Sequence, residues 1–225
     1  MLSIFFTVLR EGDGDNLGPR GGLGYDPGTM AGRLEVVTGC MFSGKTEELL
    51  RRAERARIAK KQVLLFKPEL DTRYALEEVV THYGRSLPCR RLPTNIAWPD
   101  FSRLITGPPF PLGHVFAFDE VHFFGPGFPG LCERVVALGG RVIVAGLDLN
   151  FRGEPFGPMP ELLALADEVV KLAAVCTVCG EPATRSQRLV DGCPVTAGPE
   201  VLIGGLESYE PRCRAHFAPP SARGE

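Results

Sequence analysis

The chain has 225 residues, of which 44% are hydrophobic and 23% charged, and its formal net charge is −2. This composition is ordinary for a globular protein, and the charge gives no general attraction to nucleic acid or to an anionic membrane surface. No apolar run approaches the ~20 residues of a transmembrane helix, and the apolar start lacks the basic flank and the cleavage site of a signal peptide. We therefore expect a cytoplasmic protein of one domain, or one domain plus a small lobe.

The first part of the chain predicts little order. Residues 11–32 hold eight glycines and two prolines with almost nothing to bury, and we expect residues 1–32 to form a disordered tail. Met30 lies just before the first predicted strand. Translation that begins at this methionine explains the glycine-rich segment as well as a genuine flexible extension does.

Apolar strands alternate with helices through the middle of the chain. The first predicted helix, over residues 45–60, has leucines and alanines at helical spacing on one face and arginines on the other, and a second covers residues 131–140. Such alternation is typical of a parallel sheet covered on both faces. We expect strands over residues 34–39, 62–67, 114–120, 141–148 and 167–172. The predicted organisation is an α/β core over 33–172, a loop-rich lobe over 173–217 and a flexible tail over 218–225.

A phosphate-binding loop follows the first predicted strand. The segment GCMFSGKT matches the pattern G-x-x-x-x-G-K-[ST] in full, and the required order of strand, loop and helix is present. Its backbone N–H groups and the helix dipole favour phosphate, Lys45 is expected to reach the β- and γ-phosphates, and the Thr46 hydroxyl to bind Mg²⁺. A chance match in a glycine-rich turn is the alternative. The expected phosphate-binding residues are Gly39, Cys40, Met41, Phe42, Ser43, Gly44, Lys45 and Thr46. Together with the strand pattern, they predict a P-loop NTPase fold of the RecA-like type.

Two acidic residues, Asp119 and Glu120, end the strand predicted over residues 114–120. Because the carboxyl ends of parallel strands face the ligand, we expect adjacent strands to bring Asp119 close to the phosphate loop. Asp119 is then placed to hold Mg²⁺, directly or through water, and Glu120 to accept a proton from the attacking nucleophile. Two solvated charges at a strand exit are the plainer interpretation. The pair does not decide between water, as in an ATPase, and a substrate hydroxyl, as in a kinase.

The cysteines indicate a metal site. Of the seven, only Cys176 and Cys179 form a close pair, and Cys213 and His216 repeat the same spacing. Three thiolates and one imidazole are a usual tetrahedral set for Zn²⁺, and the pattern suits a reducing compartment better than a disulfide framework. The intervening residues 180–212 exceed the usual ~15–20, but doubling a loop costs only ~0.6 kcal/mol. We expect a structural zinc, with free buried cysteines as the alternative.

Six motifs in this order resemble the zinc-containing, P-loop type of thymidine kinase (the type II family) over about residues 33–217. They are GCMFSGKT (39–46), KPELDTRY (67–74), FDEVHFF (118–124), GLDLNFRGEPF (146–156), the pairs CTVC and RCRAH, and VLIGGLESYEPRC (201–213). The resemblance implies transfer of the γ-phosphate of ATP to the 5′-hydroxyl of thymidine with Mg²⁺. It also implies a homotetramer with a lid that folds over the nucleoside.

The resemblance further implies roles for individual residues. Glu120 matches the general base. The implied nucleoside-side residues are Met41, Asp71, Arg73, His122, Phe151, Phe156, Ser186, Leu202, Ile203, Gly204 and Tyr209. Two positions depart from the family: His122 stands where glutamine is usual, and Cys40 replaces a proline or serine-like residue. His122 can substitute as a hydrogen-bond donor or make the site mildly pH-sensitive.

Two competing functions use the same motifs. A P-loop ATPase whose zinc lobe binds nucleic acid is one, but such a lobe should carry basic residues interleaved with aromatics. Residues 180–212 hold three arginines, no lysine and one tyrosine among several acids, which suits a lid better. A catalytically inactive relative is the other, and the intact Lys45, Thr46, Asp119 and Glu120 argue against it. We expect ATP and thymidine as partners, and neither nucleic acid nor a membrane.

Overall fold

The computed structural model describes residues 32–70, 78–80, 86–105, 114–195, 198 and 209–219. Of the tails predicted over residues 1–32 and 218–225, residues 1–31 and 220–225 lie outside the described part of the chain. Within the described part of the chain, none of the helices has both the length and the apolar character that crossing a bilayer requires.

A parallel sheet of six strands forms the centre of the molecule. Its order is β5-β2-β6-β7-β1-β8, and every neighbouring pair is parallel. The predicted α/β architecture is therefore confirmed. The strands are β1 (Arg33–Gly39), β2 (Val63–Pro68), β5 (Arg90–Leu92), β6 (Val115–Phe118), β7 (Arg141–Gly146) and β8 (Glu168–Leu172).

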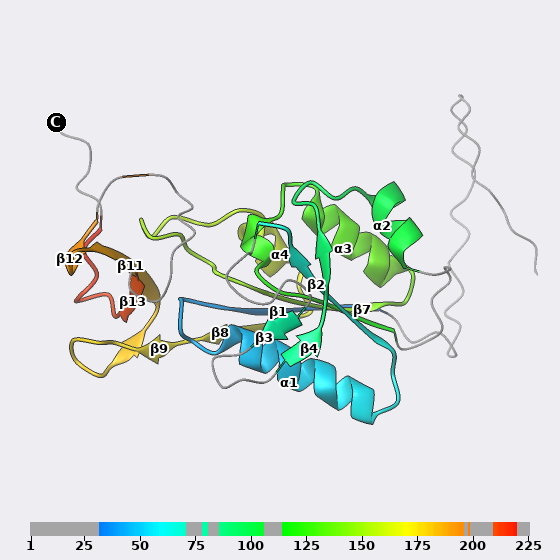
Figure 1. The fold of residues 1–225 in the computed structure, drawn as a ribbon, viewed down its shortest axis with the longest axis horizontal. Helices are drawn as coiled ribbons and strands as arrows, with labels where there is room; N and C mark the ends of the chain where they lie inside the picture. Colours follow the sequence, from blue (N-terminus) through cyan, green and yellow to red (C-terminus); the bar gives the residue numbers. More distant parts are fainter. Residues whose placement is uncertain are drawn as a thin grey trace, which may run out of the picture.

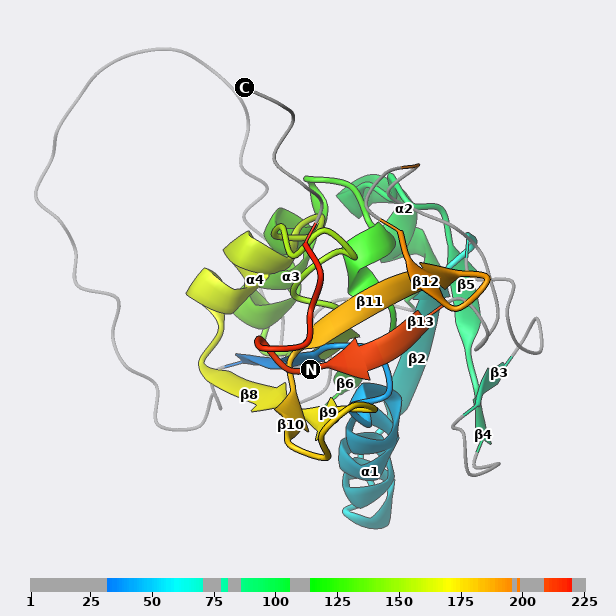
Figure 2. The same ribbon diagram turned by 90° about the vertical axis from the view of Figure 1, so that its left-hand side faces the viewer.

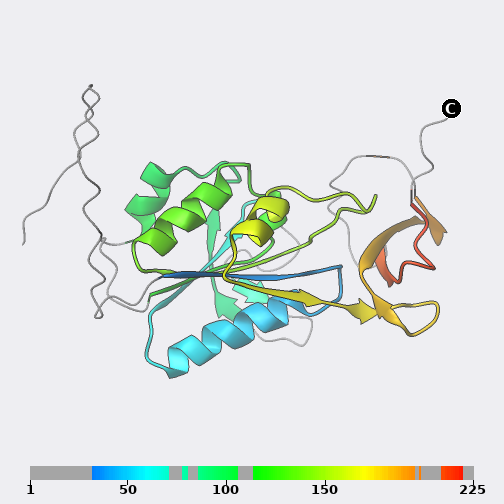
Figure 3. The same cartoon turned by 180° about the vertical axis from the view of Figure 1, so that it is seen from behind.

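Helices cover both faces of this sheet (Figure 1; Figure 3). On one face lies α1, and on the other lie α2, α3 and α4. Two separate groups of buried residues correspond to these layers: the larger includes Phe101, Phe128 and Leu131, and the smaller includes Leu49 and Leu50 of α1. The helices are α1 (Lys45–Ile58), α2 (Trp98–Leu104), α3 (Phe128–Ala137) and α4 (Met159–Leu165), with a 3₁₀ turn η1 (Val121–Phe123).

The first helix buries the face that the sequence predicts, with one addition. Leu49, Leu50, Ala53 and Ala56 are buried, as their spacing indicates. Arg52 is buried too, which contradicts the expectation that the arginines all occupy the outer face. One of its partners is Glu35, a charged residue in the middle of β1 that is 1% exposed. The inner strand β1 is therefore not apolar throughout.

Several short elements were not predicted. The edge strand β5 and helices α2 and α4 carry weak periodic patterns, and both helices have a proline at their first or second position, where it is tolerated. A small antiparallel hairpin, β3 (Glu78–Val80) and β4 (Ser86–Pro88), lies beside the sheet in Figure 2.

A second group of strands continues from the end of β8 and lies at one end of the molecule (Figure 1; Figure 2). Antiparallel pairing joins β9 to β10, and β11 to both β12 and β13. The strands are β9 (Ala174–Val175), β10 (Pro182–Ala183), β11 (Arg185–Val190), β12 (Cys193–Pro194) and β13 (Tyr209–Arg212). This placement sets the cysteine pairs beside the carboxyl ends of the parallel strands.

Candidate active site

The phosphate loop connects β1 to α1 through a backbone that few residues adopt. Gly39 has φ 144°, Phe42 has φ 65° and Gly44 has φ 84°. A Cβ atom at Gly39 would lie 2.3 Å from the carbonyl oxygen of Leu172, so any larger residue would displace β8. At Gly44 the surrounding space is open, and the left-handed backbone itself favours glycine. Both glycines of the motif are thus required by conformation.

Lys45 lies inside this loop. Its Nζ donates a hydrogen bond of 2.7 Å to the carbonyl oxygen of Cys40, and the residue is 8% exposed. Burial lowers the pKa of the Lys45 ammonium, and the nearby charges of Glu120 and Asp119 oppose that shift without cancelling it. The ammonium therefore lies close to both acidic residues at the end of β6.

Thr46 and Asp119 meet at the mouth of the loop. The Thr46 hydroxyl donates a hydrogen bond of 3.0 Å to Asp119 Oδ2. The proximity that we expected is present, but its expected cause is wrong: β1 and β6 are not adjacent, because β7 lies between them. Thr46 reaches Asp119 from the first turn of α1, across the end of the intervening strand. An alcohol and a carboxylate oxygen at this position are typical ligands of a nucleotide-bound Mg²⁺.

Glu120, the residue after Asp119, has a strained backbone conformation. Its backbone is left-handed, with φ 52° and ψ 39°, and its N–H donates to Asp119 Oδ1 at 3.0 Å. A non-glycine residue held in this region costs about 1–3 kcal/mol and often marks a functional site. One oxygen of its carboxylate, Oε2, lies 3.3 Å from Nε2 of His122. The strain turns Glu120 away from the direction of the strand and toward that histidine.

Two aromatic clusters surround this edge. The Phe156 ring lies 4.7 Å from that of His122 and 6.0 Å from that of Phe123, edge-on to the latter. Phe151 lies beneath the guanidinium of Arg188, at 3.7 Å from the ring centroid. Arg188 also donates from Nε to the Tyr209 hydroxyl at 2.8 Å. Phe151, Arg188 and Tyr209 therefore join the β7–α4 loop to β11 and β13.

The phosphate loop also contacts β10 and β11. Met41 donates its backbone N–H to the Ser186 hydroxyl at 2.9 Å, and the Cys40 thiol donates to the Ala183 carbonyl oxygen at 3.2 Å. Cys40, Ala183 and Cys176 share one small buried cluster, against which Phe42 packs. The Ser186 hydroxyl thus accepts a hydrogen bond from the loop backbone, and the Cys40 thiol helps to hold the loop against β10.

The cysteine pairs converge as predicted. One ligand atom from each of Cys176, Cys179, Cys213 and His216 lies within 4.8 Å of the others. The Sγ atoms of Cys179 and Cys213 are 3.8 Å apart, close to the ~3.8 Å edge that a tetrahedron with ~2.3 Å Zn–S bonds requires. Burial raises the pKa of the Cys176 thiol, but hydrogen bonds from backbone groups outweigh it and bring that pKa to about 6. All seven cysteines are free of disulfides.

Five of the residues implied for the nucleoside side lie outside the described part of the chain, and the structure says nothing of them. They are Asp71, Arg73, Leu202, Ile203 and Gly204. Sequence reasoning in turn missed Arg188, which is 2% exposed and makes the contacts between the two strand groups. The available signal was an arginine two residues after Ser186, inside a short strand.

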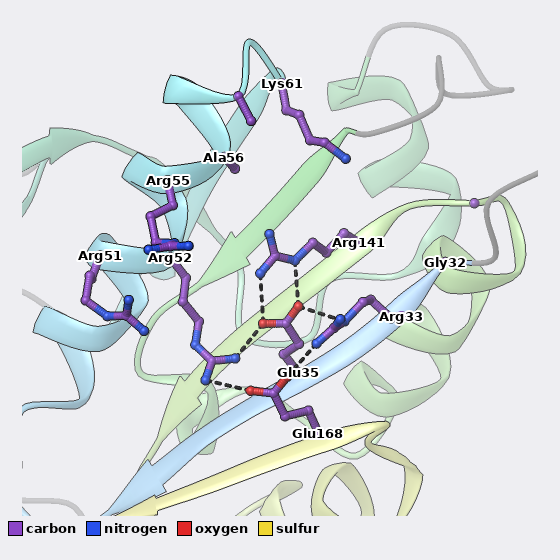
Figure 4. Close-up of a pocket in the computed structure, with 12 residues that line it drawn as sticks. Gly32, Arg33, Glu35, Arg51, Arg52, Arg55, Ala56, Lys61, Arg141 and Glu168 are labelled. Carbon is purple, nitrogen blue, oxygen red and sulfur yellow. Dashed lines mark hydrogen bonds and ion pairs between the residues drawn. The ribbon is translucent and has the colours of Figure 1, made fainter.

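A hollow lies at the opposite end of the sheet from the phosphate loop, near the start of β1 and β7. It has a volume of about 690 Å³ and includes Arg33, Glu35, Arg52, Arg141 and Glu168 in its lining. In Figure 4 three arginines point at the carboxylate of Glu35. This network is far along the strands from the phosphate loop, since β1 begins at one and ends at the other. It supports the sheet and is no part of the candidate active site.

A parallel sheet, a complete phosphate loop after its first strand, and a threonine–aspartate contact at the loop's mouth define a P-loop nucleoside-triphosphate-binding protein. The family model described as thymidine kinase matches residues 32–217. A curated thymidine kinase of Coprothermobacter proteolyticus is 50% identical over 198 residues, which cover 85% of this chain and 93% of that relative. The chain therefore belongs to the thymidine kinase family, and the alternative of a nucleic-acid-binding ATPase is not favoured.

Proposed function

We propose that the protein transfers the γ-phosphoryl group of ATP to the 5′-hydroxyl of thymidine and yields thymidine monophosphate and ADP. Family membership supports the two substrates. The observation that carries the chemistry is the shared Asp119 carboxylate, which accepts from Thr46 on one oxygen and from the Glu120 N–H on the other. Phosphate loop and acidic pair thus meet at one point.

The loop binds and orients the triphosphate. Backbone N–H groups between Gly39 and Lys45 surround the phosphates, and the Lys45 ammonium exchanges its contact with the Cys40 carbonyl for the β- and γ-phosphate oxygens. Thr46 and Asp119 would hold Mg²⁺, which neutralises charge on the phosphate oxygens when bound. The burial of Lys45 strengthens its attraction for the phosphates, because the surrounding medium screens charge poorly.

Glu120 acts as the general base. Its carboxylate takes the proton of the thymidine 5′-hydroxyl while the oxygen forms a bond to the γ-phosphorus and the bond from that phosphorus to the bridging oxygen of ADP breaks. The left-handed backbone of Glu120 and its neighbour His122 set the direction of the carboxylate. A nucleoside hydroxyl replaces water in this reaction because the aromatic residues nearby exclude solvent.

The nucleoside lies between the phosphate loop and the aromatic clusters. Phe156 gives an apolar surface for a pyrimidine and its methyl group, Phe151 carries the guanidinium of Arg188 on its ring, and Tyr209 and Ser186 add hydroxyl groups. Met41 contributes from the loop side. Asp71, Arg73, Leu202, Ile203 and Gly204 remain expected contacts from the resemblance alone.

A bound zinc ion would join the two ends of the second strand group. The tetrahedral spacing of Cys176, Cys179, Cys213 and His216 supports a structural ion, which leaves no position for substrate. The corresponding organisation is a nucleotide-binding core over 33–172 and a zinc-binding lid domain over 173–217. The homotetramer stays a prediction, which light scattering of the purified chain would test.

The decisive experiment measures phosphorylation of each common nucleoside with ATP and Mg²⁺. We expect thymidine monophosphate from thymidine, with little or no product from purine nucleosides. The matched control omits the nucleoside and follows ADP release, because an ATPase would release ADP equally well in both. Equal ADP release with and without thymidine, and no thymidine monophosphate, would refute the proposal.

A further inference from the structure

The imidazole of His122 lies between a backbone donor and the proposed base. We propose that His122 is a positioning residue for Glu120: its Nε2 lies 3.3 Å from Oε2, close by but not in hydrogen-bond geometry in this structure, and its N–H attracts that oxygen so that the carboxylate keeps its direction toward the 5′-hydroxyl of the nucleoside. This inference rests on the proposed function, because it assigns His122 a part in the same phosphoryl transfer. The residue itself does not touch the reacting atoms.

The surroundings of His122 fix its ring. The residue lies in the 3₁₀ turn η1, directly after Glu120, and its side chain is fully enclosed. Its ring centroid is 4.1 Å from that of Phe123 and 4.7 Å from that of Phe156. A Cβ atom at Gly157 would come within 2.2 Å of the His122 carbonyl oxygen, so the α4 side also presses close. A ring packed in this way cannot turn without moving its neighbours.

A backbone hydrogen bond selects the tautomer. The N–H of Leu147, at the end of β7, lies 3.1 Å from Nδ1 of His122 and can only donate. Nδ1 must therefore carry a lone pair, and the single proton of the neutral ring lies on Nε2. That atom is the one 3.3 Å from Glu120 Oε2. A protonated ring would set a second N–H against that of Leu147, so the arrangement favours a neutral donor.

The consequence falls on Glu120. Its side chain is 18% exposed, and a carboxylate at the end of a left-handed turn has two soft torsions of its own. The N–H of Nε2 beside one oxygen restricts this freedom, and a misplacement of about 1 Å can cost about 100-fold in rate. His122 thereby acts on turnover through the orientation of Glu120, while the nucleoside contacts that set affinity are made elsewhere.

Two substitutions test the roles of the two ring nitrogens of His122 separately. In His122→Gln the amide nitrogen reaches the place of Nε2 and can donate to Glu120, but no acceptor remains for Leu147. In His122→Asn the amide oxygen reaches the place of Nδ1 and can accept from Leu147, but nothing reaches Glu120. The first variant keeps the proposed positioning contact, and the second keeps the structural one.

We expect kcat and melting temperature to rank the two variants in opposite orders. The kcat for thymidine should fall by about 10-fold or more in His122→Asn and be clearly higher in His122→Gln, with the thymidine KM of both within about threefold of wild type. The melting temperature should instead be lower in His122→Gln. The same pair at His114, which lies just before β6 at the other end of the sheet, should show no such separation of kcat.

A merely structural role predicts that kcat follows the melting temperature, with His122→Asn the better enzyme, and that result would overturn the inference. Equal kcat in the two variants would overturn it as well. A wild-type chain that makes no thymidine monophosphate would instead refute the proposed function. As a further check, His122→Asn should lower the residual rate little in a Glu120→Gln background, because the positioned carboxylate is already gone.

Discussion

Replacing Glu35 by glutamine should destabilise the protein strongly although the side chain keeps its size. Glu35 is 1% exposed and accepts from Arg141 on both oxygens, from Arg52 at 2.5 Å and from Arg33 at 2.9 Å. Burial alone would raise the pKa of its carboxyl, but the hydrogen bonds and charges of these arginines lower it below the usual 4.5. The folded state therefore prefers the ionised form.

The magnitude follows from the charge left behind. Glutamine removes a carboxylate that three arginines share. Arg52, whose side chain is 9% exposed, then keeps only Glu48 and Glu168 as partners, and breaking a buried charge pair costs up to about 3–5 kcal/mol. For a chain of this length that is a fall in melting temperature of about 6–20 °C. The matched control is Glu168→Gln. Glu168 also pairs with Arg52 but is 40% exposed, so it should cost less than about 1 kcal/mol.

Urea denaturation followed by fluorescence of the single tryptophan, Trp98, would measure both variants. The difference between wild type and Glu35→Gln should be full above pH 4.5 and decline as the pH falls below it, because the Glu35 carboxyl of the unfolded chain takes up a proton first and that of the folded chain only at a lower pH. If Glu35→Gln is no less stable than Glu168→Gln at neutral pH, the account of the buried network is wrong.

Three further perturbations address the active site and the lid. Glu120→Gln should lower kcat by about 100–10,000-fold and leave ATP affinity near wild type, and a rate within a few-fold of wild type would remove Glu120 from the base role. Metal analysis should find about one zinc per chain. Cys176→Ser should lower both melting temperature and ATP affinity because Cys176 packs with Cys40 of the loop, whereas a metal-free chain with unchanged fold would contradict the zinc proposal. Arg188→Lys keeps the charge but loses the stacking on Phe151, so the thymidine KM should rise by about 5–30-fold while the ATP KM stays constant; parallel changes in both would argue for general unfolding.

The sequence predicts the features that depend on residues close together in the chain. The phosphate loop needs two glycines at strained positions, a lysine and a threonine, all within eight consecutive residues. It can therefore be recognised in the sequence without knowing what it contacts. The five predicted strands are also present, because each has a short, mostly apolar run between turns. The metal ligands converge because their two pairs have a spacing that chemistry restricts.

Features that depend on distant partners were missed. Glu35 interrupts an apolar strand, and its buried pairing depends on Arg52 and Arg141, which are 17 and 106 positions away, as well as on the nearby Arg33. Strand β5, Arg90–Leu92, carries two arginines and joins the sheet only through its pairing with β2. The order of strands, which separates β1 from β6, likewise follows from the three-dimensional topology and from no single motif.

The contacts between the phosphate loop and the second strand group have a consequence for synthesis of the chain. Cys40 and Met41 bond to residues 143 and 145 positions further on, and β1 itself lies between β7 and β8. At about 5–20 residues per second, a ribosome needs about 7–30 s to bridge that interval. A nascent chain therefore emerges with its first strand unpaired and its loop unsupported. ATP meets its site only when translation is nearly complete, so it stabilises the finished protein and cannot guide the early stages of folding.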